Sequence, residues 1–213
     1  MITQKSTITT EVIFSDDKKQ RYLLRKEWDS KKRKAMVLMI NPSSAGEISI
    51  DFTTMYVINN LVNLDYGSVE ILNLFSSMNI QLNSDLNNTQ VTDTNNDNQI
   101  VSSASKVNDI IIAWGKSGGM YKKIKERQKQ VMKLLEPFKE KILTIVDSNG
   151  ISGFHPLAPQ IRFQWNLKNF DLDTQTQASN SPIKEQAQSD PTLQEKAGIK
   201  AKGNKPKAKK RGK

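Results

Sequence analysis

Apolar residues gather in short runs that are separated by polar segments. Two such segments, 11–14 and 21–24, flank the polar turn 15–18 and predict a β-hairpin. Further along the chain, four nearly continuous apolar runs have the length of strands, at 35–40, 69–75, 109–114 and 142–146. Runs of this kind are typical of strands that are buried on both faces, as in a parallel sheet.

Between these runs the apolar spacing is helical. Asp51 is a residue type that caps helices, the apolar positions after it repeat with a helical period, and Gly67 predicts the end of this helix. Two further helices are predicted around 97–106 and over 118–136, the second amphipathic and rich in lysine. The polar stretch 83–98 predicts a loop or lid.

The order of these elements predicts the fold class. A strand followed by a helix, repeated along the chain, favours right-handed crossovers and parallel pairing. We therefore expect an α/β domain with a four-stranded, mostly parallel sheet, helices on both faces of the sheet and an N-terminal hairpin.

The composition changes from Asp171 onward, to Gln, Ser, Asn, Thr, Pro and Lys without periodicity. This change predicts a domain over 1–170 and a disordered tail over 171–213. Nine of the 32 basic residues and none of the 22 acidic ones lie within 196–213, which leaves +1 of the net charge of +10 for the rest of the chain. A basic tail of this kind attracts nucleic acid, although it can also serve solubility. The basic residues that we expect to contact DNA here are Lys205, Lys207, Lys209, Lys210 and Arg211.

Several classes of protein are excluded or disfavoured by what the sequence lacks. It has no cysteine, which excludes disulfides, zinc–thiolate sites and cysteine-ligated iron–sulfur clusters. The first residues lack the apolar segment of a signal peptide, and no apolar run approaches the ~20 residues that span a bilayer. We expect a cytoplasmic, monomeric protein without membrane contact, metal or cofactor.

Unusual residues lie near the end of each of the four predicted strands or just after it. Ligands of open parallel sheets bind beyond the carboxyl ends of the strands, so these residues are expected to converge on one edge. Each also has a structural interpretation: Asn-Pro is a common turn, a buried amide needs only partners, a tryptophan can belong to the core, and a single histidine is more often structural than catalytic. The segments concerned are Asn41-Pro42-Ser43-Ser44, Asn73, Trp114-Gly115-Lys116 and His155-Pro156-Leu157.

In this order the four segments resemble the motifs of the uracil-DNA glycosylase superfamily. Asn41-Pro42 is similar to its Asn/Asp-Pro motif, in the Asn form of the mismatch-specific uracil/thymine branch. Leu72-Asn73 is similar to the strand whose Asn reads the base, and the segments at 114–116 and 155–159 are similar to its Trp-Gly strand and its His-Pro loop. The chain also resembles a family of uncharacterised bacterial and phage proteins that share Asn-Pro-Ser, Asp-x-Thr (here 51–53), Asn-Leu-Phe, Trp-Gly and His-Pro-Leu.

The resemblance implies hydrolysis of the N-glycosidic bond of uracil, or of a related base, in DNA. His155 would donate a hydrogen bond to the leaving base and Asn41 would orient the attacking water. An amide is a poor base, so slow turnover is expected. Asn73 would read the edge of the base, and Phe52, or alternatively Tyr56, would stack on the base.

The same resemblance implies a DNA-binding surface around the base. Pro42 and Ser43 would line the substrate site, Ser44 and Lys116 would contact DNA, and Leu157 would wedge into the duplex. Two other functions stay open: an inactive nucleic-acid-binding module, and a nucleoside or nucleotide hydrolase. The sequence also leaves open a protein inhibitor, or a replication or repair protein, as a further partner beside uracil-containing DNA.

Overall fold

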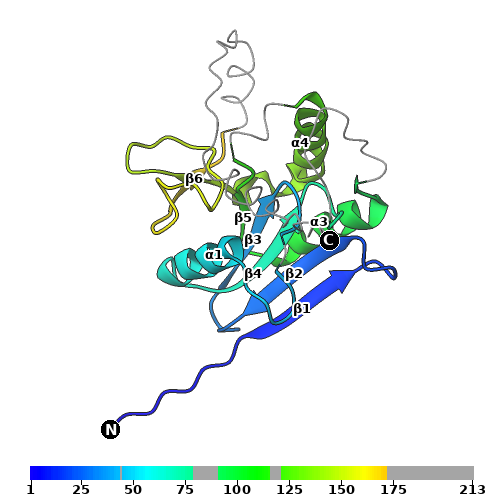
Figure 1. Ribbon diagram of the computed structural model, residues 1–213. Helices are drawn as coiled ribbons and strands as arrows, with labels where there is room; N and C mark the ends of the chain where they lie inside the picture. Colours follow the sequence, from blue (N-terminus) through cyan, green and yellow to red (C-terminus); the bar gives the residue numbers. More distant parts are fainter. Residues whose placement is uncertain (44, 79–90, 116–120, 172–213) are drawn as a thin grey trace, which may run out of the picture. The chain divides into compact units, whose positions relative to one another are not determined.

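The computed structural model describes residues 1–43, 45–78, 91–115 and 121–171, and within them seven strands form one sheet. Its strand order is β1-β2-β4-β3-β5-β6-β7 (Figure 1). The strands are β1 (Thr9–Phe14), β2 (Arg21–Glu27), β3 (Arg33–Met39), β4 (Tyr66–Asn73), β5 (Asp109–Ile112), β6 (Ile142–Val146) and β7 (Asn166–Asn169).

The sheet is mixed. Parallel pairing joins β4 to β3, β3 to β5 and β5 to β6. Antiparallel pairing joins β1 to β2, β2 to β4 and β6 to β7. The prediction of a four-stranded, mostly parallel sheet is therefore wrong: the described sheet has seven strands, and half of its six pairings are antiparallel.

The difference has a physical cause at each edge of the sheet. On one side the predicted hairpin joins the sheet, since β2 pairs along β4 with Leu24 opposite Ile71. On the other side β7 is too polar to show an apolar run, and most of its residues are exposed. An edge strand needs only backbone partners on one side, so it can form without a buried side-chain pattern.

The described helices are α1 (Phe52–Asn63), α3 (Thr94–Lys106) and α4 (Lys122–Leu134), and the shorter η2 (Glu136–Lys141) follows α4. Helix α1 begins after its predicted cap, but it ends well before Gly67, and Asp65 with φ 63° makes the left-handed turn. Gly67 instead lies in β4, where a Cβ atom would stand 1.8 Å from the carbonyl oxygen of Asp29. Helix α3 begins at Thr94, so the end of the predicted loop 83–98 is helical, and 83–90 lie outside the described residues.

Both faces of the central strands are buried, which explains their continuous apolar runs. Met36 and Leu38 of β3 face a cluster that includes residues of α3 and α4. Ala35 and Val37 face the opposite cluster, which includes residues of α1. Residues Met1–Asp171 form one compact unit, and 172–213, almost all of the predicted tail, lie outside the described residues.

Candidate functional site

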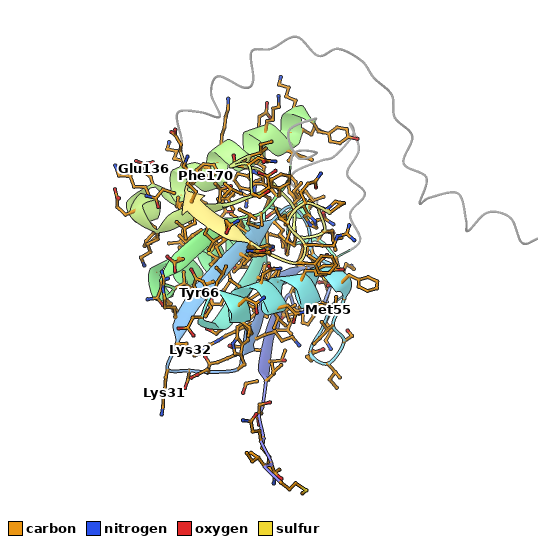
Figure 2. The ribbon with its side chains drawn as sticks, turned by 90° about the vertical axis from the view of Figure 1, so that its left-hand side faces the viewer. Lys31, Lys32, Met55, Tyr66, Glu136 and Phe170 are labelled. Carbon is orange, nitrogen blue, oxygen red and sulfur yellow. The ribbon has the colours of Figure 1, made fainter. Side chains whose placement is uncertain are left out.

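The carboxyl ends of β3, β4 and β5 finish at one edge of the sheet, which we call the rim. The amide of Leu74 donates to the carbonyl of Met39 at 2.9 Å, and the amide of Ala113 donates to that of Leu38 at 2.9 Å. In Figure 2, Met55, in the first turn of α1, lies on the side of the rim. Tyr66 and Lys32 lie on the opposite side. The segments that follow β3, β4 and β5 are therefore neighbours.

Arg21 also lies at the rim, because β2 runs antiparallel to β4 and starts where β4 ends. Its amide donates to the carbonyl of Ser76 at 2.7 Å. The side chain is only 1% exposed, and its Nη1 donates to the carbonyl oxygens of Ser43, at 3.2 Å, and of Ala45. Nε and Nη2 are buried without a hydrogen-bond partner. Burial lowers the pKa of Arg21 to about 10, although Asp51 opposes this, so the guanidinium stays charged at neutral pH.

Asp51 is a half-buried carboxylate at the rim, at the N-cap of α1. Its Oδ1 accepts a hydrogen bond from the amide of Thr54 at 2.8 Å. Burial opposes ionisation, but the hydrogen bonds from Thr54 and from the side chain of Ser43, together with the positive charge of Arg21, prevail, and the pKa of Asp51 is lowered. The group is therefore an anion at neutral pH, beside a buried cation.

His155 is held as a neutral imidazole with a defined tautomer. Its Nδ1 accepts a hydrogen bond from the amide of Leu157 at 3.2 Å, so the proton of the neutral ring is on Nε2. Burial lowers the pKa of His155, and the charge of Asp51 opposes this. Gly115, which has φ 75°, approaches the main chain of His155 closely, and a Cβ atom on Gly115 would stand 2.9 Å from the Cβ of His155. The glycine of the Trp-Gly segment thus makes room for the histidine.

Asn73, the last residue of β4, is 1% exposed, and its Nδ2 is buried without a hydrogen-bond partner. Two elements hold the backbone beside it. Asn96 of α3 donates to the carbonyls of Asn73, at 3.1 Å, and of Leu74, at 3.2 Å. Arg127 of α4 donates to the carbonyl of Leu74 at 2.9 Å and forms an ion pair with Asp97. The position of Asn73 is therefore fixed from outside its own strand.

The Asn-Pro segment after β3 is the fourth part of the rim. Nδ2 of Asn41 lies 3.4 Å from the carbonyl oxygen of Pro42, a long contact that leaves the half-buried amide little constrained. Pro42 is buried, and the buried hydroxyl of Ser43 is directed to Asp51, whose pKa it helps to lower. Ser44 lies outside the described residues.

The predicted stacking and wedge residues have separate positions. Phe52 is 72% exposed at the start of α1, and Leu157 is 40% exposed. Tyr56 makes an edge contact with Phe163 at 5.6 Å and lies under the guanidinium of Arg162 at 5.9 Å. Lys116 and all the tail residues predicted to contact DNA lie outside the described residues.

Three of the residues described above had no role in the sequence analysis. Arg21 lies at the rim because of an antiparallel pairing. Asn96 and Arg127 reach the end of β4 and the residue after it from helices, so no local pattern marks them. Asp51 was predicted as a helix cap and as part of the Asp-x-Thr motif, without a role in the site. The sequence around this cap does not indicate that its charge acts on a histidine about a hundred residues away.

A cavity of about 350 Å³ lies elsewhere, between the end of α1 and the segment that leads into β7. It is lined by Asn60, Asn63, Leu64, Phe163, Gln164, Trp165 and Asn166. None of these side chains ionises, whereas the rim contains Asp51 and His155, so acid–base chemistry is expected at the rim. Among the described residues no three His, Asp or Glu side chains group as metal ligands, and no helix is long and apolar enough to cross a membrane.

Comparison with known proteins gives one match. The family described as "Protein of unknown function (DUF1643)" matches residues 21–157, about two thirds of the chain. The match starts at Arg21 and ends at Leu157, so it contains Asn41, Asp51, Asn73 and His155. No curated protein and no solved structure gives a significant match.

Proposed function

The chain belongs to the DUF1643 family, whose description assigns no activity, and we propose that it is a DNA glycosylase that hydrolyses the N-glycosidic bond of uracil, or of a related base, in DNA. The observation that carries the proposal is that Asn73 and His155 belong to the same rim. Asn73 has an unpartnered amide nitrogen, and His155 has a neutral ring with its proton on Nε2.

His155 is placed in this proposal as the hydrogen-bond donor to the leaving base. When the glycosidic bond breaks, the electron pair leaves with the base and negative charge develops on its carbonyl oxygen. A neutral imidazole held by a backbone amide at Nδ1 can donate its Nε2 proton in a hydrogen bond to that oxygen. Such a donor stabilises the developing anion without a proton transfer, which contributes on the order of 10²–10³ in rate.

The buried amide of Asn73 is the group that would recognise the base. A buried amide nitrogen without a partner costs about 1–3 kcal/mol, so the folded chain bears this cost for a reason that its own contacts do not explain. An amide presents a donor and an acceptor side by side, which matches the carbonyl and imide N–H of uracil. Asn41, whose own hydrogen bond is long, can orient water at the sugar.

The partner that fits this chemistry is DNA containing uracil. Nine cations within 196–213 supply attraction to phosphates that a small-molecule hydrolase does not need. The protein would then bind nonspecifically through its tail and act through the rim.

Abasic-site formation tests the proposal directly. Purified protein is incubated with single-stranded and duplex oligonucleotides that carry one uracil, and alkali then cleaves the strand at abasic sites. We expect cleavage at uracil and none at cytosine or thymine in the matched oligonucleotides. Asn73→Ala should lose most of the activity, whereas Asn63→Ala, an exposed amide at the end of α1, should retain it.

Two results would overturn the proposal. DNA binding without abasic sites at any salt concentration or pH would make the protein a nucleic-acid-binding module. Release of base from free nucleosides, but not from DNA, would make it a nucleoside hydrolase.

A further inference from the structure

Phe163 is a large apolar side chain that the proposed function leaves without a task, and it is 75% exposed. Its near neighbours Ile161 and Trp165 are buried, so this part of the segment between β6 and β7 has a fixed inner face, and Phe163 lies on the outer one. A single exposed apolar side chain is common on proteins and needs no explanation by itself. The groups around Phe163 therefore decide whether it belongs to a binding site.

A second aromatic ring lies against Phe163, and a cation lies over that second ring. Tyr56, in α1, makes an edge contact with Phe163, with 5.6 Å between the ring centres and 85° between the ring planes. The guanidinium of Arg162 is 5.9 Å from the centre of the Tyr56 ring, within the range of a cation–π interaction. We call these three side chains the aromatic platform. Arg162 covers one face of Tyr56, whereas Phe163 keeps most of its surface open to a partner.

Hydrogen bonds hold the aromatic platform in place and connect it to the segment that carries His155. Nδ2 of Asn60 donates to the carbonyls of Tyr56, at 2.8 Å, and of Arg162, at 2.9 Å, so α1 and the segment before β7 are joined at the platform. Nη2 of Arg162 donates to the carbonyl of Leu157 at 3.1 Å, and the amide of Leu157 donates to Nδ1 of His155. A ligand on the platform would therefore be only two hydrogen bonds away from the imidazole of the rim.

The charge of the two elements that form the platform favours an anionic partner. Helix α1 contains no charged residue, and the stretch 148–170 contains Arg162 and Lys168 but no acidic residue. An aromatic face with a cation beside it fits a nucleotide, because the base is flat and the phosphate is an anion. In a duplex the face of each base is covered by its neighbours, so only an unpaired base can stack on Phe163.

We propose that the aromatic platform binds an unpaired nucleotide that flanks the base removed at the rim, a role whose place in the reaction rests on the proposed glycosylase function. The flanking base stacks on Phe163, and its phosphate contacts the guanidinium of Arg162. Tyr56 supports both groups from α1. The substrate class is then single-stranded DNA, because a paired strand does not offer a free base to the platform.

The experiment measures the affinity of the full-length protein for three probes without uracil: a single-stranded thymidine oligonucleotide, an abasic deoxyribose-phosphate strand of the same length, and a matched duplex. Phe163→Ala should bind the thymidine strand about 5–150 times more weakly and the other two probes as the wild type does, because stacking needs a free base. Phe163→Leu, which keeps an apolar side chain without an aromatic face, should show the same loss, and Phe163→Trp should restore the affinity. Val62→Ala, which shortens a 47% exposed side chain of α1, should match the wild type. Arg162→Gln should lower the slope of log K against log salt by about 0.7 on the single strands, whereas Phe163→Ala should keep it.

Failure of the platform and failure of the glycosylase function give different results. Equal affinity of Phe163→Leu and the wild type for the thymidine strand overturns the platform, and so does an equal loss of affinity for all three probes. A wild type that binds the thymidine strand no better than the abasic strand overturns it as well, and leaves Phe163 to a partner other than nucleic acid. Excision of uracil is measured separately: if none occurs and the expected binding pattern holds, only the glycosylase function fails, and the platform remains a site for single strands.

Discussion

Replacing Gly115 with alanine tests whether the turn after β5 determines the position of His155. Gly115 has φ 75°, and the added methyl group would stand 2.9 Å from the Cβ of His155. Carbon atoms in ordinary contact are about 3.5–4.0 Å apart, so the two groups must separate by roughly 0.6–1.1 Å. The backbone of the 153–157 segment has to move to allow this, because Cβ is fixed to the main chain.

Two magnitudes follow. A left-handed conformation costs a non-glycine residue about 1–2 kcal/mol, which lowers the melting temperature of a domain of this size by roughly 2–8 °C. A misplacement of about 1 Å at a catalytic group costs on the order of 10² in rate. Gly115→Ala should therefore remain folded, melt somewhat lower and excise uracil about a hundred times more slowly.

Gly150→Ala is the matched control, because Gly150 has φ 77° and nothing within 4 Å of the position of a Cβ atom. It carries the same conformational cost without the clash. His155 is the only histidine in the chain, so NMR signals of one imidazole report its tautomer and its pKa. In Gly115→Ala the Nε2-protonated form should lose population and the pKa should rise toward its ordinary value, whereas Gly150→Ala should match the wild type. If the two variants share the same imidazole signals and excision rates, Gly115 does not position His155.

Three further predictions concern stability and binding. Asn73→Ala should cost much activity and little stability, because its Nδ2 has no partner to lose, whereas Asn96→Ala should destabilise by about 1–3 kcal/mol since the buried carbonyl of Asn73 loses the donor from Asn96; urea denaturation compares them. Burial lowers the pKa of His155, so the folded state disfavours the protonated ring. The contribution of His155 to stability should be complete above pH 6.5 and fall as the pH drops through the lowered pKa. Denaturation measured across pH should show this dependence in the wild type and not in His155→Gln. A chain that ends at Phe170 should bind DNA more weakly at low salt and show a shallower slope of log K against log salt, by about 0.9 per lost phosphate contact on duplex DNA; equal slopes would show that the tail does not touch DNA.

Features that depend on neighbours in the chain were accessible from the sequence. The four apolar runs are strands because burial on both faces leaves no polar alternation, as Met36 and Val37 show on opposite faces of β3. Asp51 was predicted as the cap of α1 because the capping hydrogen bond reaches only three residues, to Thr54.

Features that depend on distant pairing were not accessible. The side chain pattern of β2 predicts a hairpin, but nothing in it specifies that Leu24 pairs with Ile71. Gly67 was interpreted as a helix end because glycine commonly ends helices, whereas its actual constraint is the carbonyl of Asp29 against β4. Four exposed or half-exposed residues make β7, and no apolar signal separates such an edge strand from a loop.

The error in the predicted fold and the residue missed at the rim have the same cause. Only an antiparallel strand beside β4 can start at the edge where β4 ends, so the pairing that makes the sheet mixed is also the one that brings Arg21 under the loop after β3. A fully parallel neighbour would present its amino-terminal residue at the opposite edge. The buried guanidinium then has two effects: it holds the carbonyls of Ser43 and Ala45, and it keeps Asp51 ionised. Arg21→Lys should separate them, because a lysine retains the charge but cannot reproduce the planar geometry of the guanidinium. Loss of excision with an unchanged melting temperature in Arg21→Lys would show that the geometry of the loop, and not the charge alone, prepares the rim.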